Sequence, residues 1–211
     1  MHFAWVFTLL LAIFAKSTNQ GFLIGIPLIA LGEAVRIWSH GYLQKIRTLA
    51  IDGPYAFVRN PLYIGNFLIG FGFCSIIWHP VIGAIFVAGF FFVYWVTVKA
   101  EEEKLAAKFG EAYLDYVRSV PRFIPKLVPC AKREHAEFRL RRAWGHGEHI
   151  TIFGILDLLL MIYLRQILYQ ERRPLTPAVL IEIALAVVFG LLVLYSMFSR
   201  YGKSKETKPS L

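Results

Sequence analysis

Apolar residues gather in long stretches of the chain, and short polar segments separate them. A helix that crosses a membrane needs about 20 mostly apolar residues, and most of these stretches approach that length. The pattern predicts spanning helices over residues 2–15, 21–38, 62–78, 81–98, 150–169 and 178–198. We therefore expect an all-α fold, a multi-pass transmembrane bundle of about six spans, in which the first helix is the shortest.

Two polar segments also carry helical periodicity. Over 38–49, apolar residues recur at helical spacing between polar and basic ones, which predicts an amphipathic helix lying in the membrane interface. A second apolar stripe runs over 101–117, and three glutamates stand at its beginning. Acidic side chains are favourable in the first turn of a helix, so this stripe predicts a helix that begins at Glu101.

Composition and charge agree with a membrane protein. Hydrophobic residues make up 57% and charged residues 18%, against about 45–50% and about 25% in soluble domains. These values exclude a disordered protein and an ordinary soluble enzyme. The net charge of +9 would suggest nucleic acid in a soluble chain, but loops on the cytoplasmic side of membrane proteins carry such an excess. We expect membrane lipids and no nucleic acid as partners.

The distribution of Lys and Arg predicts the topology. If both termini and the two long polar segments lie in the cytoplasm, eighteen Lys and Arg residues fall on that side and three on the other. Such a bias follows the positive-inside rule. We therefore expect an integral membrane protein with both termini and its active site on the cytoplasmic side.

The predicted spans divide the chain into five parts. Residues 1–38 hold the N-terminal transmembrane helices, and 39–126 hold the interfacial helix, a helical hairpin and the candidate chemistry. A basic connector over 127–149 is expected to meet anionic lipid headgroups. Residues 150–198 form a two-helix transmembrane extension that either completes the acceptor site or mediates a homodimer, and 199–211 a disordered tail.

Polar and conformationally special residues gather where the third predicted span begins. They are Gly53, Pro54, Arg59, Asn60, Pro61, Tyr63, Gly70 and Gly72. Because a proline disfavours the helical conformation for the residue before it, the chain should bend at Asn60. Arg59 and Asn60 then offer hydrogen-bond donors just outside the helix. The glycines permit close approach of another helix or of a ligand.

A second group of charged residues lies at the end of the fourth span, where Glu101 and Glu102 emerge. The third and fourth spans form a hairpin, so these carboxylates should emerge beside Arg59 and Asn60. Arginine, amide, phenol and carboxylate groups would then surround an apolar cavity. Such a cavity suits an amphiphilic cofactor at the membrane surface.

Two motifs resemble a known family. The block Gly-Pro-Tyr-x-x-Val-Arg-Asn-Pro-x-Tyr-x-Gly begins at Gly53. The block Glu-Glu-x-x-Leu-x-x-x-Phe-Gly-x-x-Tyr-x-x-Tyr begins at Glu101, and Val-Pro-Arg-Phe-Ile-Pro follows it. Together they resemble the isoprenylcysteine carboxyl methyltransferase and phospholipid methyltransferase superfamily of integral membrane methyltransferases. The resemblance covers roughly 30–126, and the two blocks stand in the family's order.

The resemblance implies S-adenosylmethionine as the cofactor and methyl transfer to a lipophilic acceptor from the bilayer, of the prenylcysteine carboxylate kind. Carried over position by position, it implies catalytic roles for Arg59, Glu102 and Arg122. It assigns to cofactor binding the residues Asn60, Pro61, Tyr63, Gly70, Gly72, Glu101, Glu102 and Tyr113.

One position departs from the family pattern, because Asn60 stands where the family usually has histidine. An amide donates and accepts hydrogen bonds but does not titrate near neutrality. If the histidine acts as a general base in some relatives, that role is lost here. If it only binds the cofactor, little changes.

Other functions stay open on the sequence. The acceptor can instead be a phospholipid amine, which must lose a proton before it attacks, so the dependence of rate on pH separates it from a carboxylate. A membrane reductase of the sterol reductase type would bind a nicotinamide cofactor, and a non-catalytic scaffold would bind neither. Glu101 and Glu102 favour the methyltransferase.

Two further groups of charged residues are interpreted as structural. His146 and His149 lack the spacing of a metalloprotease motif and a third ligand, so we predict no metal site. Glu33 and Arg36 are three residues apart in a predicted helix, which allows an ion pair on one face.

Overall fold

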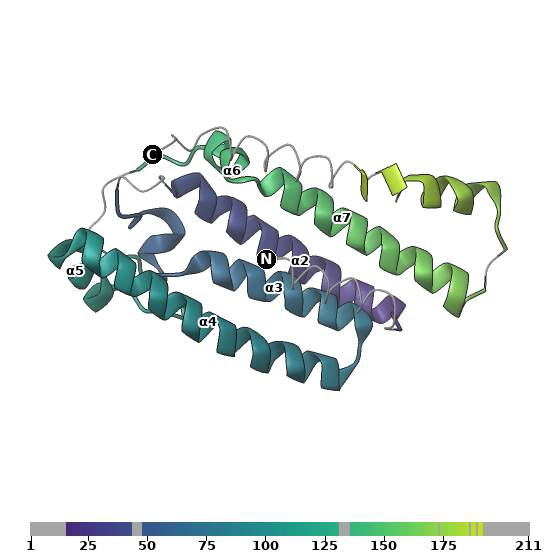
Figure 1. Ribbon diagram of the computed structural model, residues 1–211, viewed down its shortest axis with the longest axis horizontal. Coiled ribbons are helices and arrows are strands. Elements are labelled where there is room, and N and C mark those ends of the chain that lie inside the picture. Colours follow the sequence, from purple (N-terminus) through teal and green to yellow (C-terminus); the bar gives the residue numbers. More distant parts are fainter. Residues whose placement is uncertain are drawn as a thin grey trace, which may run out of the picture. The chain divides into compact units, whose positions relative to one another are not determined.

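The computed structural model describes residues 16–43, 48–130, 136–172, 174–185, 187–188 and 190–191. Within these residues the regular secondary structure consists of helices (Figure 1). The chain forms two compact units: one is Asn19–Glu148, and the other comprises Met1–Thr18 with His149–Leu211. The helical content agrees with the predicted all-α fold.

Three apolar helices build the unit Asn19–Glu148, and Figure 1 shows them side by side. They are α2 (Asn19–Tyr42), α3 (Pro61–Ile77) and α4 (Pro80–Phe109). Their positions agree with the predicted spans over 21–38, 62–78 and 81–98. Helices α2 and α4 are long and apolar enough to cross a membrane, whereas α3 is a shorter apolar helix of 17 residues.

The other unit contains most of α7 (Glu148–Arg165), which a π-helical turn, η2 (Gln166–Gln170), continues. Together these form a third helix that could cross a membrane, and it agrees with the span predicted over 150–169. The backbone is helical again over 177–185, where the last span is predicted to begin. The span predicted over 2–15 and the predicted tail lie outside the described residues.

Helices α2 and α3 pack through glycines. A Cβ atom on Gly32 would lie 2.6 Å from the Gly65 carbonyl oxygen, and one on Gly65 would lie 2.7 Å from that of Gly32. The pattern repeats along the helices, because a Cβ on Gly25 would lie 2.5 Å from the Gly72 oxygen and one on Gly72 would lie 2.7 Å from the Gly25 oxygen. Small residues at such positions let two backbones approach closely.

Helix α3 begins as its sequence predicts. Gly53 and Pro54 open a short 3-10 helix, η1 (Gly53–Ala56). Asn60 then has φ of −127° and precedes Pro61, the first residue of α3. The Asn60 side chain makes no capping hydrogen bond to the described part of the helix. The Asn60 amide group is therefore not used to cap α3.

The prediction that a helix begins at Glu101 is wrong. Helix α4 continues without interruption to Phe109, so Glu101 and its neighbours lie inside it rather than in a first turn. Glu, Lys, Ala and Leu all favour helix, and nothing between the apolar and polar parts of α4 stops it. The break comes at Gly110, whose φ is +53°, and α5 (Glu111–Ser119) follows.

The interfacial helix predicted over 38–49 is also not a separate element. Its first residues belong to α2, which ends at Tyr42, and 48–50 are not helical, while 44–47 lie outside the described residues. Within the predicted connector over 127–149 there is a short helix, α6 (Leu140–His146), which packs against α2.

The segment after α5 runs along the segment before α3. The Arg59 amide donates to the Pro121 carbonyl at 2.9 Å, and the Lys126 amide donates to the Phe57 carbonyl at 3.0 Å. These bonds fix the loop that carries Arg122 against the beginning of α3. Arg122 thereby reaches the polar part of α4.

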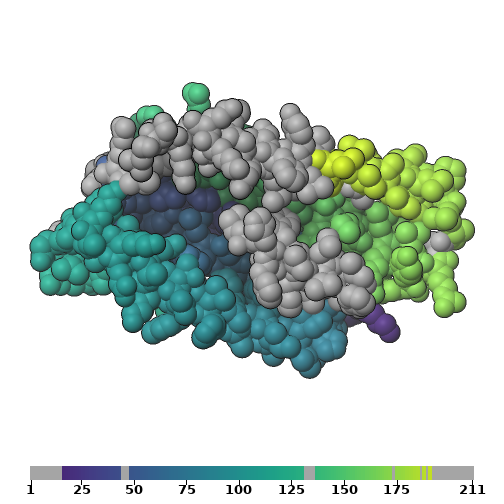
Figure 2. All heavy atoms as spheres, viewed as in Figure 1, coloured from purple at the N-terminus to yellow at the C-terminus, as the bar shows by residue number. Residues whose placement is uncertain are grey.

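Helix α4 leaves large apolar side chains exposed along its length. Phe92 is 73% exposed, Val93 60% and Trp95 57%. Figure 2 shows α4 in teal along one face, uncovered by other described helices. Large apolar side chains exposed along one helix mark a surface that meets lipid or another protein, which agrees with a helix facing the membrane.

Candidate active site

The three residues predicted to be catalytic are in contact, because the carboxylate of one of them, Glu102, binds the other two. Glu102 Oε1 lies 3.0 Å from Arg59 Nη1 and accepts a hydrogen bond from Arg122 Nε, also at 3.0 Å. The second Glu102 oxygen pairs with the other arm of the Arg122 guanidinium. The Arg59 and Glu102 side chains are only 11% and 12% exposed. The arrangement holds two guanidinium groups where the beginning of α3 lies beside the polar part of α4.

The Arg122 guanidinium has further contacts that fix its position. It stacks on the ring of Trp95, with its carbon 5.5 Å from the ring centroid. The hydrogen bond with Glu102 raises the pKa of Arg122 above its already high ordinary value, so the group stays positively charged. The Tyr94 hydroxyl donates to the Arg122 carbonyl oxygen at 3.3 Å.

Glu101 and Tyr63, two predicted cofactor residues, form a hydrogen bond. The Tyr63 hydroxyl donates to Glu101 Oε1 at 3.1 Å. The Tyr63 ring meets Tyr94 edge-to-face, with the ring centroids 4.8 Å apart. The phenol and the carboxylate therefore meet across α3 and α4, as the hairpin predicts.

A cavity of about 610 Å³ lies beside these groups. Four predicted site residues line it, namely Arg59, Asn60, Glu101 and Tyr113. Sequence reasoning did not assign to the site the lining residues Leu43, Thr48, Leu49, Ala50, Tyr55, Lys104, Leu105, Lys108, Phe109, Tyr116 and His146. Several of these belong to the two motifs, which could have indicated them. Thr48 and His146 lie outside both motifs, and no local pattern marks either as a site residue.

Three buried polar atoms at the cavity have no hydrogen-bond partner among the described residues. They are Arg59 Nε, Asn60 Nδ2 and the Tyr55 hydroxyl. Buried polar groups in folded proteins are almost always hydrogen-bonded, so each exception needs an explanation. All three belong to residues that line the cavity, and all three can donate. A polar ligand in the cavity would satisfy them.

The phenols around the cavity stay neutral. Burial raises the pKa of Tyr113 above its ordinary value, an effect that the nearby Arg59 guanidinium partly offsets. Burial likewise raises the pKa of Tyr55 and of Tyr116. The Tyr116 hydroxyl donates to the Tyr55 carbonyl oxygen at 2.8 Å. These side chains therefore act as hydrogen-bond donors and packing surfaces rather than as anions.

Three predicted cofactor residues lie at helix contacts rather than at the cavity lining. Pro61 is fully buried as the first residue of α3. Gly70 faces the ring of Phe86 from α4, and Gly72 packs against α2. Their assignment to the cofactor stays a prediction.

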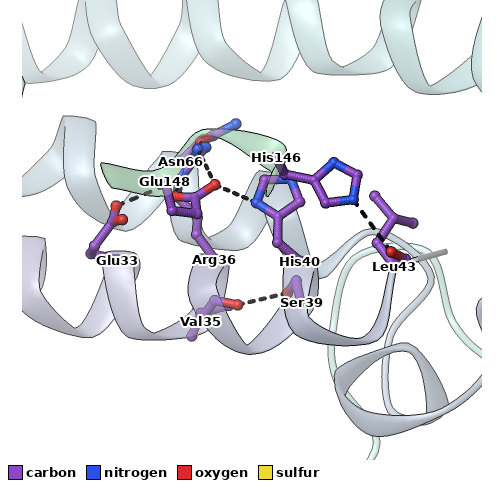
Figure 3. Close-up of polar contacts among 9 residues, drawn as sticks. All are labelled: Glu33, Val35, Arg36, Ser39, His40, Leu43, Asn66, His146 and Glu148. Carbon is purple, nitrogen blue, oxygen red and sulfur yellow. Dashed lines mark hydrogen bonds and ion pairs between the residues drawn. The ribbon is translucent and has the colours of Figure 1, made fainter. Parts of the chain in front are cut away.

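A second polar cluster lies between α2, α3 and the beginning of α7 (Figure 3). The predicted ion pair of Glu33 with Arg36 is confirmed at 3.5 Å. Arg36 also donates to Glu148 at 2.8 Å and to the Asn66 side chain, contacts that the sequence alone did not indicate. Among the described residues there is no group of three or more His, Cys, Asp or Glu that could hold a metal ion.

The chain is similar to several known proteins. The profile of the phospholipid methyltransferase family matches residues 20–112. The cobalt-zinc-cadmium resistance protein CzcN of Cupriavidus metallidurans is 31% identical over 107 residues, which are 50% of this chain and 48% of that protein. The nickel-cobalt-cadmium resistance protein NccN of Alcaligenes xylosoxydans xylosoxydans is 30% identical over the same length.

Relatives of a second kind, named as methyltransferases, also match. The protein-S-isoprenylcysteine O-methyltransferase of Schizosaccharomyces pombe is 33% identical over 103 residues, which are 47% of this chain and 43% of that enzyme. The chain thus spans about half the length of the curated relatives it matches. No solved structure gives a significant match. The region that matches the family profile, 20–112, contains Glu102, Arg59 and most residues that line the cavity. Arg122 and the lining residues Tyr113, Tyr116 and His146 follow it. Residues 20–112 thus match the phospholipid methyltransferase family, and part of the chain is similar to protein-S-isoprenylcysteine O-methyltransferases.

Proposed function

We propose that the protein is an integral membrane methyltransferase that uses S-adenosylmethionine and acts on a lipophilic carboxylate of the prenylcysteine kind. The cavity beside Arg59, Asn60 and Glu101 carries this proposal. It combines unpaired donors, a carboxylate and apolar walls at the end of apolar helices. The match of residues 20–112 to the phospholipid methyltransferase family also supports it.

The residues around the cavity fit the proposed cofactor. S-adenosylmethionine carries a carboxylate, an ammonium group, ribose hydroxyls and an adenine ring. Arg59 and Asn60 would donate to the carboxylate, and Glu101 would accept from the ammonium group or the hydroxyls. Leu105 and Phe109 offer apolar surface for the adenine. A volume of about 610 Å³ also lies within the usual range of ligand pockets, about 300–1,000 Å³.

The cofactor's sulfonium supplies an activated methyl group, so the protein's main task is to position the acceptor. Arg59 and Arg122 provide two guanidinium groups that can orient an anionic acceptor. Glu102 holds both of them, and we assign it a positioning role. Burial keeps water away from Arg59, whose side chain is 11% exposed, which strengthens its attraction for an acceptor carboxylate.

The acceptor would enter from the bilayer between α3 and α4. Aromatic side chains line this hairpin, among them Phe67, Phe90 and Tyr94. The Lys and Arg bias supports a cytoplasmic location for the cavity and for both termini. Association of two copies through the C-terminal helices stays a prediction. The relatives favour a methyltransferase over a reductase of the sterol type.

Transfer of a labelled methyl group tests this function. Protein in lipid nanodiscs is incubated with S-adenosylmethionine labelled in its methyl group, together with either a farnesylated cysteine or phosphatidylethanolamine. We expect label in the farnesylated cysteine as a base-labile methyl ester. Label in phosphatidylethanolamine alone would shift the acceptor to a phospholipid amine. Label in neither, from protein shown to be folded, would contradict the proposed acceptors.

A further inference from the structure

The loop that follows α5 exposes three large aliphatic side chains. Ile124 is 80% exposed, Leu127 98% and Val128 74%. All three belong to residues 121–130, a stretch without regular secondary structure. Single exposed apolar residues are normal on a protein surface, but a group of them on one short loop marks a surface that meets lipid or another protein.

The depth of this loop follows from the contacts of Phe123, the residue before Ile124. The centroid of its ring lies 4.6 Å from that of Tyr94 and 6.4 Å from that of Phe91, both on α4. Lys99 is the first charged residue of α4. Tyr94 precedes it by five residues, which is about 7 Å along a helix that rises about 1.5 Å per residue. The loop therefore lies beside the apolar part of α4, not beside its charged end.

The exposed side chains of the loop continue the membrane-facing surface of α4. Trp95 is largely exposed, and its ring stacks on that of Phe123 with the planes 11° apart and the centroids 6.5 Å apart. Tryptophan is enriched where a membrane meets water. Through these two rings, the apolar face of α4 passes into the aliphatic side chains of the loop at the level of the membrane interface.

The backbone of the loop also suits an apolar environment, in which unpaired amide and carbonyl groups are costly. The Lys126 amide donates to the Phe57 carbonyl at 3.0 Å, and the Cys130 amide donates to the Ala56 carbonyl at 2.9 Å. Proline has no amide hydrogen to satisfy, and the loop contains Pro121, Pro125 and Pro129. Half of its residues therefore either lack an amide hydrogen or have it bonded within the protein.

Both cationic side chains of the loop bind groups of the protein. Arg122 pairs with Glu102 and stacks on Trp95. The Lys126 ammonium donates to the Ser119 carbonyl oxygen at 2.5 Å. Long basic side chains at a membrane surface keep their charge in a polar region while their stems lie along apolar groups. The charges of the loop thus leave its aliphatic side chains to contact lipid.

We propose that loop 121–130 inserts into the membrane leaflet on the side of the candidate cavity, with Ile124, Leu127 and Val128 among the acyl chains just below the headgroups. Its partner is phospholipid, because the loop continues the membrane-facing surface of α4 and lies at the depth of its apolar residues. The insertion fixes Arg122 at the membrane surface, where a lipophilic acceptor presents its polar end. The membrane contact itself holds whichever reaction the protein catalyses.

Fluorescence quenching measures the depth of the loop in the full chain. Leu127→Cys, made together with Cys74→Ala and Cys130→Ser, carries an environment-sensitive fluorophore in nanodiscs of phosphatidylcholine. The control is the same fluorophore on Glu111→Cys, because Glu111 is exposed at the beginning of α5, beyond the end of α4. The quenchers are iodide in the water and phosphatidylcholine that carries a spin label at carbon 5 or carbon 12 of an acyl chain.

We expect the label at 127 to be quenched by the lipid spin labels and protected from iodide, and the label at 111 to show the reverse. Carbon 5 should quench the label at 127 more than carbon 12, because interfacial elements enter only about 5–10 Å into the boundary between headgroups and acyl chains. Quenching at 127 by iodide alone would mean that the loop lies in water. Protection from both quenchers would mean that protein covers it, and either result would overturn the proposal.

A substitution that keeps both native cysteines provides a second measurement. Leu127 makes little contact with the rest of the protein, so a loss of stability in Leu127→Asp has to come from its contact with lipid. We expect this variant to melt in nanodiscs at a lower temperature than Leu114→Asp, which changes an exposed leucine on α5. Equal melting temperatures would contradict the insertion.

The outcomes distinguish this proposal from the proposed function. Protein that binds S-adenosylhomocysteine while its loop is open to iodide overturns only the insertion. Protein whose loop is quenched by lipid but that binds no S-adenosylhomocysteine supports the insertion and overturns only the proposed cofactor.

Discussion

Arg59 Nη1 and Glu102 Oε1 lie 3.0 Å apart and join the loop before α3 to the polar end of α4. The same carboxylate also holds Arg122. Because the Arg59 and Glu102 side chains are largely buried, neither charge is well compensated by water if its partner is removed. The geometry of the candidate active site therefore depends on one glutamate.

Glu102→Gln is expected to weaken the binding of S-adenosylhomocysteine by about tenfold or more. Each hydrogen bond to a charged group contributes about 1.5–3 kcal/mol, and the variant weakens those that position Arg59 and Arg122. Calorimetry on protein of verified helical content measures the change. Glu103→Gln is the matched control, because Glu103 is the exposed neighbour on the same helix. Equal affinities in the two variants would contradict a positioning role for Glu102.

Asn60→Ala is expected to weaken cofactor binding without lowering the stability of the ligand-free protein. Asn60 Nδ2 is buried without a hydrogen-bond partner within bonding distance among the described residues, although the side chain lies close to Tyr94, so its removal should cost the ligand-free fold little. A lost ligand contact of about 0.5–1.5 kcal/mol lowers affinity about twofold to tenfold. Thermal unfolding with and without S-adenosylhomocysteine measures both quantities. If ligand-free stability falls and affinity stays the same, the amide is structural.

Gly32→Ala is expected to destabilise the protein by about 1–3 kcal/mol, the usual effect of overpacking. The added Cβ would lie 2.6 Å from the Gly65 carbonyl oxygen, a backbone atom that cannot move aside alone. Gly89→Ala is the control, since a Cβ there meets nothing within 4 Å in the described structure. It should be neutral or stabilising, because alanine favours helix. Thermal unfolding in detergent should separate the two variants, and similar melting temperatures would contradict the close packing of α2 on α3.

The stability of the protein should fall as the pH rises above about 10. Burial holds the pKa of Tyr55 and Tyr116 above the ordinary value, which is about 10 in an unfolded chain. A raised pKa in the folded state stabilises the neutral form, so this contribution is complete below pH about 10 and is lost as the pH rises toward the folded value. Denaturant titrations from pH 9 upward measure the slope.

Tyr116→Phe provides the control for this pH dependence, because it removes one of the buried phenols and its hydrogen bond to the Tyr55 carbonyl. The variant should be less stable at neutral pH and should lose less stability between pH 10 and 12. A wild type whose stability is unchanged over this range would contradict the burial of these phenols.

Much of the fold follows from where apolar residues stop. The turn at His79 and Pro80 separates α3 from α4, as predicted. The end of α4 was not predictable from hydropathy, because the helix continues through polar residues that favour helix until Gly110 interrupts it. Hydropathy reports which residues prefer lipid, whereas the helix end depends on backbone conformation.

In the candidate site, too, the sequence predicts some contacts and not others. The hairpin of α3 and α4 predicts that Arg59 and Asn60 meet Glu101, and the structure places all three at one cavity. The packing of Gly72 against α2 depends on a helix distant in sequence. His146 reaches the cavity on α6, a helix too short for its periodicity to be recognised. Residues that a motif does not contain become visible only when tertiary contacts are known.

Titration of the detergent-purified protein with S-adenosylhomocysteine tests the central claim most directly. The account predicts saturable binding, and at about 100 times the Kd the ligand should stabilise the fold by about 2.7 kcal/mol. Glu102→Gln should weaken this binding and Glu103→Gln should not. Absence of binding to protein whose helical content and cooperative unfolding show it to be folded would contradict the methyltransferase assignment.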